Sequence, residues 1–498
     1  MRTLICKRTN LIALGTAFLT VLAASPLAAG TPPSQRIRHV LLISIDGLHA
    51  LDLDNFIKLR PHSNFAQLAS RGVTYTETFT AKPSDSYPGL MSIVTGGSPN
   101  ATGIWYEGAW ARELSPPGSD CSKKGVEVVW DSSIDRDKNA FDGGGIDPAK
   151  LPLDPSKGCS RVYPHDYLRV NTIFEVVHAA GLRTAWIDKH PGYEMTNGPS
   201  GKGVDDLFTP EISRNHSLAA HDVNAGQAFD DAKVTALLNE IDGRDHTGKS
   251  QWGVPVLFGA SFQNFTTAQK SCGYANASGD LTPCEVRTLA HLDEDIGSLL
   301  RALKAHGLIS STLVIITAKH GDGPLEARRH RIIPDTLLPK VINLEHPGVL
   351  ADAYQDGTLA SIWLNDQNQT EAVVKTLSQP DVQSQLDIKR TLSGESLKLL
   401  FNDPRKDPRI PDIVIEPNLG GIYTDADSSF LMEHGGFSDD DTHVALLVSG
   451  PGVPPAQTIR TPVQTTQIAP TILHELGLDP AALKAVRMEH TSTLPGLP

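Results

Sequence analysis

The sequence has few cysteines, few long apolar runs, and fewer basic residues than acidic ones. Of its 498 residues only five are cysteine, and 44 Lys and Arg stand against 57 Asp and Glu, giving a formal net charge of −13. A surface this negative argues against duplex nucleic acid as a partner. It also implies that an anionic substrate needs local cations or a metal ion at its site.

The only long apolar run begins at Leu11 and ends at Ala24, after a short basic stretch. Small residues and a proline follow it, which is the order of a secretory signal peptide, and we predict one over residues 1–29. An uncleaved anchor is the alternative, disfavoured because the proline breaks the run early. We expect a secreted, periplasmic or extracellular protein with no transmembrane segment after signal removal. Losing three basic residues and no acidic one makes its charge −16.

Four cysteines remain after the signal, namely Cys121, Cys159, Cys272 and Cys284. An even number in an oxidising compartment predicts two disulfides, for which three connectivities exist. We favour Cys121 with Cys159 and Cys272 with Cys284, because each pair closes a short loop. A four-thiolate zinc site is the alternative, but the closely spaced pairs that it needs are missing.

No linker, repeat or low-complexity tract divides residues 30–498, so we expect a single α/β domain with loop insertions. Continuous apolar runs suit strands buried on both faces, and they predict a large, mostly parallel central sheet flanked by helices. An amphipathic helix is predicted over 286–303. The Gly- and Pro-rich stretch of about 107–167 is predicted to be an insertion near the active face, or a surface excursion without function. The strand-like runs are 40–45, 184–187, 254–258, 313–317 and 444–448.

Two segments carry the first chemical signals. The strand before Asp46 and Gly47 aims a carboxylate at the sheet edge where ligands gather, although Asp-Gly alone is more often a turn. Ser86, followed by Tyr87 and Pro88, opens a helix-like run. Backbone N–H groups and the positive dipole end there favour an alkoxide and a bound phosphoryl group. Taken alone, Ser86 is an ordinary N-cap serine.

Together the segments resemble the phosphodiesterase/nucleotide pyrophosphatase group of the alkaline phosphatase superfamily. That group has a strand ending in Asp-Gly, then Pro-x-x-Thr/Ser-aromatic-Pro running into Thr-Gly and Pro-x-x-x-Gly-Ile. A segment from Gln467 also resembles its last core helix. The resemblance implies an alkaline-phosphatase-like α/β sandwich, with Ser86 as the nucleophile and both Asp46 and Ser86 as metal ligands. The residues in register are Asp46, Ser86, Tyr87, Pro88, Thr95, Gly96, Pro99, Gly103 and Ile104.

The resemblance also implies His320 and His434 as metal ligands, but Lys319 stands where the family has an aspartate. A further Asp and His, four residues apart in two-zinc relatives, are missing from the segment 261–270. We therefore expect one or two divalent ions, with zinc as the expected metal. Lys319 is predicted to be a catalytic cation, because an ammonium can also neutralise charge on a phosphoryl oxygen.

Four residues are predicted to bind substrate. Glu107 follows the Gly-Ile segment, Lys189 and His190 follow a strand, and Asn264 stands in the segment that lacks the Asp/His pair. Lys189 and Lys270 are alternatives to Lys319 as the second cation. Either Asp188 or His190 is a further candidate for a missing ligand or a substrate contact, the alternative being a solvated loop. Asp322, Arg328 and Asp441 carry less weight.

We expect a metal-dependent hydrolase of small phosphate esters, acting on phosphodiester or nucleotide pyrophosphate bonds through a covalent Ser86 intermediate. The alternatives are a phosphomonoesterase, phosphonate hydrolase or sulfatase of the same superfamily, or a secreted binding protein that lost catalysis. The sulfatase branch has a Cys/Ser-x-Pro-x-Arg segment, and the arginine is absent after Ser86. The sequence does not determine the oligomeric state.

Overall fold

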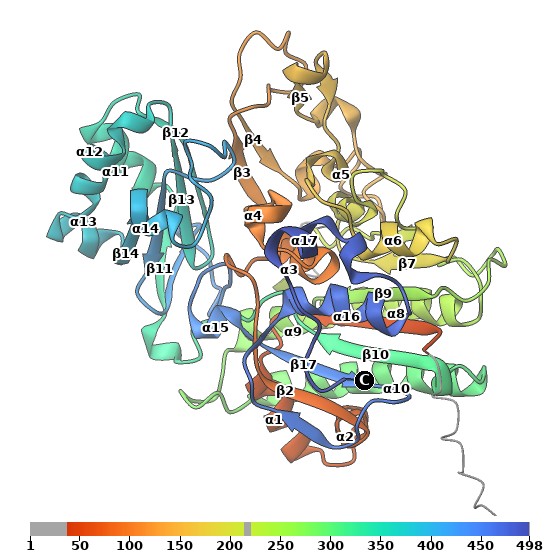
Figure 1. Ribbon diagram of the computed structural model, residues 1–498. Coiled ribbons are helices and arrows are strands. Elements are labelled where there is room, and N and C mark those ends of the chain that lie inside the picture. The colour runs from red at the N-terminus through yellow and green to blue at the C-terminus, as the bar shows by residue number, and fades with distance from the viewer. Residues whose placement is uncertain (1–36, 214–220, 498) are drawn as a thin grey trace, which may run out of the picture. The chain divides into compact units, whose positions relative to one another are not determined.

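A nine-stranded, mostly parallel sheet forms the centre of the computed structural model, which describes residues 37–213 and 221–497 (Figure 1). The predicted signal peptide lies outside the described residues. The strand order is β18-β2-β17-β10-β1-β9-β7-β8, with β19 also paired to β2. Only β17 runs antiparallel to its neighbours in the described part of this sheet. The bounds are β1 (His39–Ile45), β2 (Gly72–Phe79), β7 (Thr184–Ile187), β8 (Asp206–Phe208), β9 (Leu257–Phe262), β10 (Thr312–Thr317), β17 (His443–Ser449), β18 (Gln457–Ile459) and β19 (Val463–Gln464).

The sheet is buried on both faces, as its continuous apolar runs predict. Along β1, Leu41 and Ile43 join one hydrophobic cluster, while Val40 and Leu42 join another. Successive side chains of a strand point to opposite faces, so the two clusters are the two cores of the sheet. The predicted mostly parallel sheet flanked by helices is therefore confirmed.

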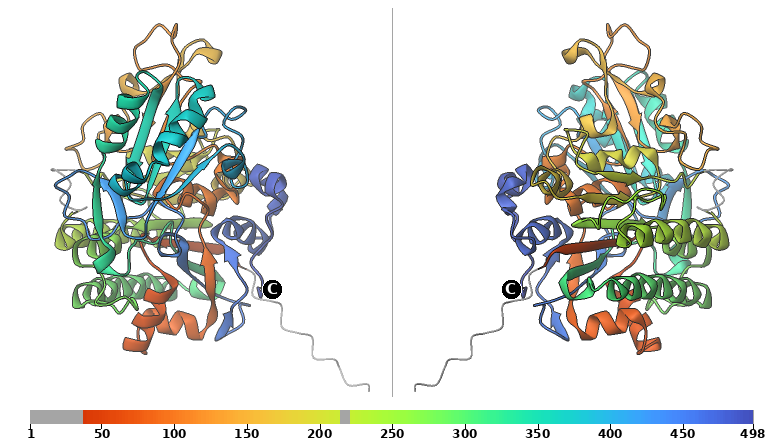
Figure 2. Two further views of the ribbon diagram at one scale, coloured as in Figure 1. Left: turned by 90° about the vertical axis from the view of Figure 1, so that its left-hand side faces the viewer. Right: turned by 90° about the vertical axis from the view of Figure 1, so that its right-hand side faces the viewer.

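Helices cover both faces of the sheet (Figure 1 and Figure 2). One core packs against α1 (Ala50–Leu59), α2 (Asn64–Ser70), α8 (Val223–Ile241), α9 (Asn264–Cys272) and α10 (Pro283–Ala305). The other packs against α3 (Ser86–Thr95), α6 (Ile173–Ala179), α16 (Ile468–Glu475) and α17 (Lys484–Glu489). The predicted helix over 286–303 lies within α10, which begins with a capping box between Thr282 and Glu285.

A second, smaller sheet lies in the chain between β10 and β17. It is antiparallel in the order β12-β13-β15-β14 and has its own hydrophobic cluster. No sequence feature had indicated this sheet, and the division into domains stays a prediction. The elements are β11 (Arg331–Pro334), α11 (Leu337–Glu345), β12 (Leu350–Asp356), β13 (Leu359–Leu364), α12 (Thr370–Leu377), α13 (Pro380–Gln385), β14 (Ile388–Ser393), α14 (Gly394–Lys398), β15 (Ile413–Pro417), β16 (Gly421–Thr424) and α15 (Asp439–Thr442).

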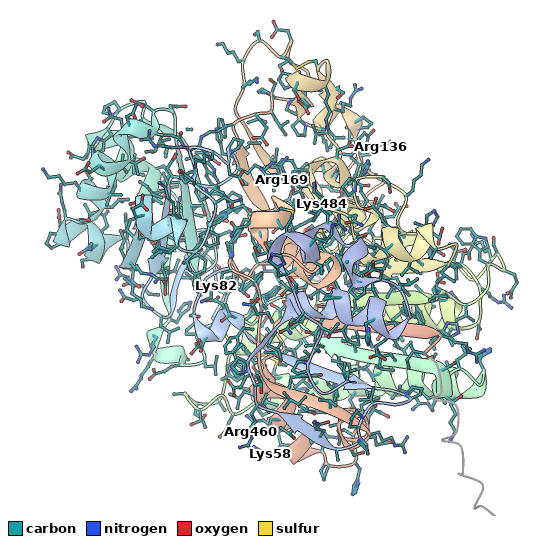
Figure 3. The ribbon with its side chains drawn as sticks, viewed as in Figure 1. Lys58, Lys82, Arg136, Arg169, Arg460 and Lys484 are labelled. Carbon is teal, nitrogen blue, oxygen red and sulfur yellow. A yellow bond between two sulfur atoms is a disulfide. The ribbon has the colours of Figure 1, made fainter. Side chains whose placement is uncertain are left out.

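The stretch of about 107–167 contains only short elements, and a disulfide joins Cys121 to Cys159. A second disulfide joins Cys272 at the end of α9 to Cys284 in α10, so both bridges have the favoured pairing. Arg169, labelled in Figure 3, donates to both oxygens of Asp407 at 2.6 and 2.7 Å. That ion pair ties the end of the stretch to the loop before β15. The elements of the stretch are β3 (Gly108–Ala111), β4 (Val126–Val129), β5 (Leu153–Asp154), β6 (Ser160–Arg161) and α5 (Pro164–Tyr167), and α4 (Pro99–Thr102) precedes it.

Across residues 37–213 and 221–497, no helix combines the length and the apolar character needed to cross a bilayer.

Candidate active site

The carboxyl ends of β1, β7 and β10 bring polar side chains from distant parts of the chain together. Asp46 follows β1, Lys189 follows β7, and Lys319 and His320 follow β10. Ser86 begins α3 at the same edge, and every one of these side chains is buried or nearly so. The carboxyl ends of parallel strands meet at one edge of the sheet. These groups therefore lie close together at that edge.

Ser86 is the first residue of α3, with Asp85 as the N-cap. Its Oγ accepts a hydrogen bond from Lys189 Nζ at 3.1 Å and lies 3.3 Å from His320 Nε2. Gly89, one turn later, lets α3 approach the end of β10, since a Cβ there would meet the Lys319 carbonyl oxygen at 2.2 Å. The hydroxyl therefore lies at a positive helix end beside an ammonium group.

Asp46 is fully buried and surrounded by donors. Its Oδ2 lies 3.3 Å from Lys319 Nζ and 3.7 Å from Lys189 Nζ. Gln263 Nε2 donates to Oδ2 at 3.2 Å, and Ser261 Oγ donates to Oδ1 at 3.1 Å. Burial by itself would raise the pKa of Asp46, but the ammonium of Lys319 in particular holds that pKa well below its usual range. Asp46 is therefore a carboxylate that already has two cationic partners.

Both lysines are held by carboxylates. Lys319 Nζ is also 3.5 Å from Asp188 Oδ1 and lies over the ring of Tyr193, 4.7 Å from its centroid. For Lys189, burial would lower the pKa, but the charges of Asp46, Glu107 and Asp188 together outweigh burial and raise the pKa above its ordinary value. Lys189 is therefore an ammonium ion at neutral pH.

A second group of donors lies beside the first. The rings of His320 and His434 stack with their centroids 3.5 Å apart. Asp322 Oδ1 lies 2.8 Å from His434 Nδ1 and 3.7 Å from His320 Nδ1, while Thr266 Oγ1 donates to Asp322 Oδ2 at 2.5 Å. One donor atom from each of His320, Asp322 and His434 lies within 4.8 Å of the others. Two imidazoles and a carboxylate in this arrangement can hold a divalent metal ion.

The pKa values of this second group shift in opposite directions. Burial would raise the pKa of Asp322, but its hydrogen bond with His434 holds it well below the usual range. Burial would lower the pKa of His434, but the same hydrogen bond raises it. The pKa of His320 is lowered, first by burial and then by the neighbouring His434. Asp322 is thus an anion between two imidazoles.

A buried lysine that the sequence analysis did not identify, Lys233, contacts Asp46 indirectly through Gln263. Lys233 on α8 lies 3.3 Å from Asp230 Oδ1 and donates to the Ser261 carbonyl oxygen at 2.8 Å and to Gln263 Oε1. Since Lys233 engages the amide oxygen of Gln263, the amide nitrogen must face Asp46. The only sequence signal for Gln263 was its place directly after β9.

The residues predicted to bind substrate lie in different surroundings. Lys189 contacts Ser86, whereas His190 Nδ1 is 2.8 Å from Glu211 Oε1. The backbone N–H of Glu107 donates to Asp85 Oδ2 at 3.0 Å, which places Glu107 beside the N-cap of α3. The buried Oδ1 of Asn264 has no hydrogen-bond partner within the described residues. Their part in substrate binding stays a prediction.

Lys270, the remaining candidate for the second cation, does not contact Asp46 or Ser86 in the described structure. Lys270 pairs with Glu433 at 2.5 Å rather than with Asp46.

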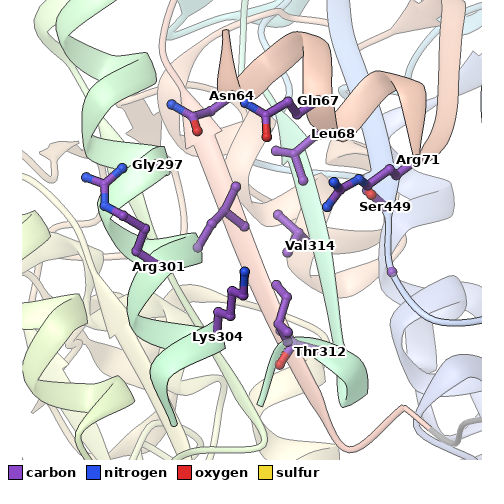
Figure 4. A pocket seen from close by; sticks show the side chains of 13 residues that line it. Asn64, Gln67, Leu68, Arg71, Gly297, Arg301, Lys304, Thr312, Val314 and Ser449 are labelled. Atoms are coloured by element: carbon purple, nitrogen blue, oxygen red, sulfur yellow. The ribbon is translucent and has the colours of Figure 1, made fainter. Parts of the chain in front are cut away.

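Two further features lie away from Ser86. Asp231, His291 and Asp295 on α8 and α10 form a second potential metal-binding cluster. Figure 4 shows a pocket of about 410 Å³ between α2, α10 and the start of β10, at the opposite edge of the sheet from His320. Its cationic lining residues are Arg71, Arg301 and Lys304, and no sequence motif leads to it.

Known proteins resemble this chain in sequence family and in fold. A family model described as "Type I phosphodiesterase / nucleotide pyrophosphatase" matches residues 40–437, and no curated protein matches the sequence. Solved structures share the fold at low identity. An inactive murine ectonucleotide pyrophosphatase/phosphodiesterase 5 in complex with AMP is 16% identical, with a TM-score of 0.56 over 89% of this chain and 95% of that one. The human protein is 18% identical, with a TM-score of 0.54 over 88% and 95%. A variant of alkaline phosphatase PafA is 13% identical, with a TM-score of 0.58 over 89% and 96%.

Proposed function

The chain belongs to the type I phosphodiesterase / nucleotide pyrophosphatase family, and from this premise we propose that it hydrolyses phosphodiester or nucleotide pyrophosphate bonds through a covalent intermediate on Ser86. The observation that carries the proposal is the position of Ser86 Oγ at the start of α3, 3.1 Å from Lys189 Nζ and 3.3 Å from His320 Nε2. A serine hydroxyl is a weak nucleophile at its ordinary pKa, and adjacent positive charge favours its alkoxide.

The reaction has two displacements at phosphorus. Ser86 Oγ bonds to phosphorus as the bond to the leaving oxygen breaks, and the serine proton ends on the departing alcohol. Water then attacks phosphorus, the Oγ–P bond breaks, and one proton of that water restores the serine hydroxyl. The ammonium groups of Lys189 and Lys319 and the N–H groups of α3 are placed to neutralise the phosphoryl oxygens in both steps.

Members of this family use metal ions, so the donors must be tested for fit. His320, Asp322 and His434 fit a divalent ion, because imidazole and carboxylate are ligands of zinc and related metals. An ion bound there would act as a Lewis acid beside the phosphoryl group. Asp46 and Ser86 do not fit one in their present surroundings, since two ammonium groups already contact them. The reaction therefore has no step at a metal ion bound to Asp46.

A diester is the preferred substrate in this proposal. Asp85 is the N-cap residue directly before the nucleophile, and extra negative charge on a monoester is unfavourable next to its carboxylate. The AMP bound by the murine protein is a product-like molecule for cleavage of a nucleotide diester or pyrophosphate. Zinc is the metal that we propose.

Export is also part of the proposal. The predicted signal peptide and the two disulfides together support secretion into an oxidising compartment.

The test is a comparison of three esters with one chromogenic leaving group. Bis-p-nitrophenyl phosphate is predicted to give a kcat/KM at least about 10-fold above p-nitrophenyl phosphate, with p-nitrophenyl sulfate unreactive. Stripping the protein with a chelator should lower the rate, and adding back zinc should restore it. A faster reaction with the monoester or sulfate would move the assignment to another branch of the superfamily, and no turnover of any ester would favour a binding protein.

A further inference from the structure

We propose that this chain holds one divalent cation, between His320, Asp322 and His434, and that the ammonium groups of Lys189 and Lys319 fill the other cation position beside Asp46 and Ser86. This deepens the proposed function and rests on it only for the role of Ser86. Neither Asp322 as a ligand nor Lys189 as the second cation follows from the family pattern.

The geometry of the lysines is the first argument. Lys189 Nζ lies 3.1 Å from Ser86 Oγ and 3.7 Å from Asp46 Oδ2, so it bridges the two groups that a shared metal ion would bridge. Lys319 Nζ approaches the same oxygen of Asp46 at 3.3 Å. A divalent cation added beside these ammonium groups would meet strong repulsion in a buried site.

Charge balance is the second argument. Each lysine of this region already has a buried carboxylate partner: Lys319 contacts Asp46 and Asp188, Lys189 contacts Asp46, and Lys233 contacts Asp230. The other oxygen of Asp46 is taken by the Ser261 hydroxyl. Since a carboxylate with two ammonium partners is already compensated, a further cation beside it would add mainly repulsion.

Around His320, Asp322 and His434, by contrast, two of the described carboxylates lack an ammonium or guanidinium partner. Glu433 has Lys270 as its partner, at 2.5 Å, whereas the contacts of Asp322 and Asp85 are imidazoles, hydroxyls and N–H groups. Among the described residues, neither of these two carboxylates has a lysine or arginine within ion-pair distance. Thr266 occupies Oδ2 of Asp322 and so leaves Oδ1 facing both histidine rings. The donor set of two imidazoles and one carboxylate is a common one for zinc.

The stoichiometry of zinc binding tests the proposal without any assay of activity. Protein stripped with a chelator and dialysed against Zn²⁺ is expected to bind one ion per chain, measured by elemental analysis. Two ions per chain in both the natural protein and Asp231→Asn, which removes a ligand of the other cluster, would show that the position at Asp46 also takes a metal, and none would show that neither position does. Either result overturns the proposal.

Single substitutions locate the ion. Asp322→Asn and His434→Gln are expected to abolish zinc binding, whereas Asp46→Asn and Ser86→Ala should keep one ion. Asp231→Asn is the matched control in the other cluster on α8 and α10, and it should also keep the ion. Circular dichroism checks that each variant is folded. Loss of zinc in Asp46→Asn, Ser86→Ala or Asp231→Asn, with retention in the folded Asp322→Asn and His434→Gln, would contradict the assignment.

The same samples separate this proposal from the proposed function. One bound zinc with no hydrolysis of any ester would leave the cation assignment standing and overturn the phosphodiesterase. Two bound zinc ions with hydrolysis of bis-p-nitrophenyl phosphate would overturn the cation assignment and leave the phosphodiesterase standing.

Discussion

Replacing Ser86 with alanine is expected to reduce hydrolysis of bis-p-nitrophenyl phosphate on the order of 10³-fold or more, because the substitution removes the hydroxyl that forms the covalent intermediate. The loss should appear in kcat rather than in KM, since the two lysines and the helix end that neutralise the phosphate remain. Steady-state kinetics on protein loaded with zinc measure both constants.

Ser92→Ala is the matched control for this variant. Ser92 is fully buried on the same helix, α3, and its hydroxyl donates to the Pro88 carbonyl oxygen rather than into the site. Its activity should stay within a few-fold of the natural protein. Equal losses in both variants would mean that α3 is sensitive to any substitution, and full activity in Ser86→Ala would exclude Ser86 as the nucleophile.

Lys319→Met is expected to lower the free energy of unfolding by about 3–5 kcal/mol, as removal of one partner from a buried ion pair does. Lys319 has no exposed side-chain area, and its ammonium contacts both Asp46 and Asp188. Without it, those carboxylates lose their shared cation while their side chains stay buried. Urea unfolding followed by circular dichroism at neutral pH measures the change.

Lys340→Met provides the control, since Lys340 is an exposed lysine on α11. The same chemical change there should alter the free energy of unfolding by less than about 0.5 kcal/mol. A Lys319→Met protein as stable as the Lys340→Met protein would show that Asp46 and Asp188 do not depend on the ammonium, and the charge balance proposed for this site would be wrong.

The central sheet could be predicted from the sequence because its strands are continuous apolar runs, buried on both faces. The ends of those runs also identified Asp46, Lys319 and His320, since the residue after a parallel strand lies at the ligand edge. The disulfide pairing followed from short loops. The small antiparallel sheet was missed although its inner strands β13 and β15 are fully buried, because its edge strands β12 and β14, half-buried or partly exposed, give no continuous apolar signal.

The contacts inside the site could not be predicted in the same way. Lys189 reaches Ser86 across 103 positions of the sequence, and Asp322 reaches His434 across 112. Both contacts depend on how strand-end loops fold back, which local patterns do not specify. Lys233 was missed because a lysine within a helix is usually solvent-exposed. Only the structure shows that its ammonium donates a hydrogen bond to Gln263 Oε1.

Trapping the covalent intermediate tests the central claim most directly. Protein mixed with bis-p-nitrophenyl phosphate, quenched in acid within the first turnover and digested, is analysed by peptide mass spectrometry. The account predicts a p-nitrophenyl phosphoryl group on the peptide that contains Ser86, and none in the Ser86→Ala protein. Turnover at the full rate with Ser86 unmodified in every quenched sample, or with the group on another residue, would contradict it.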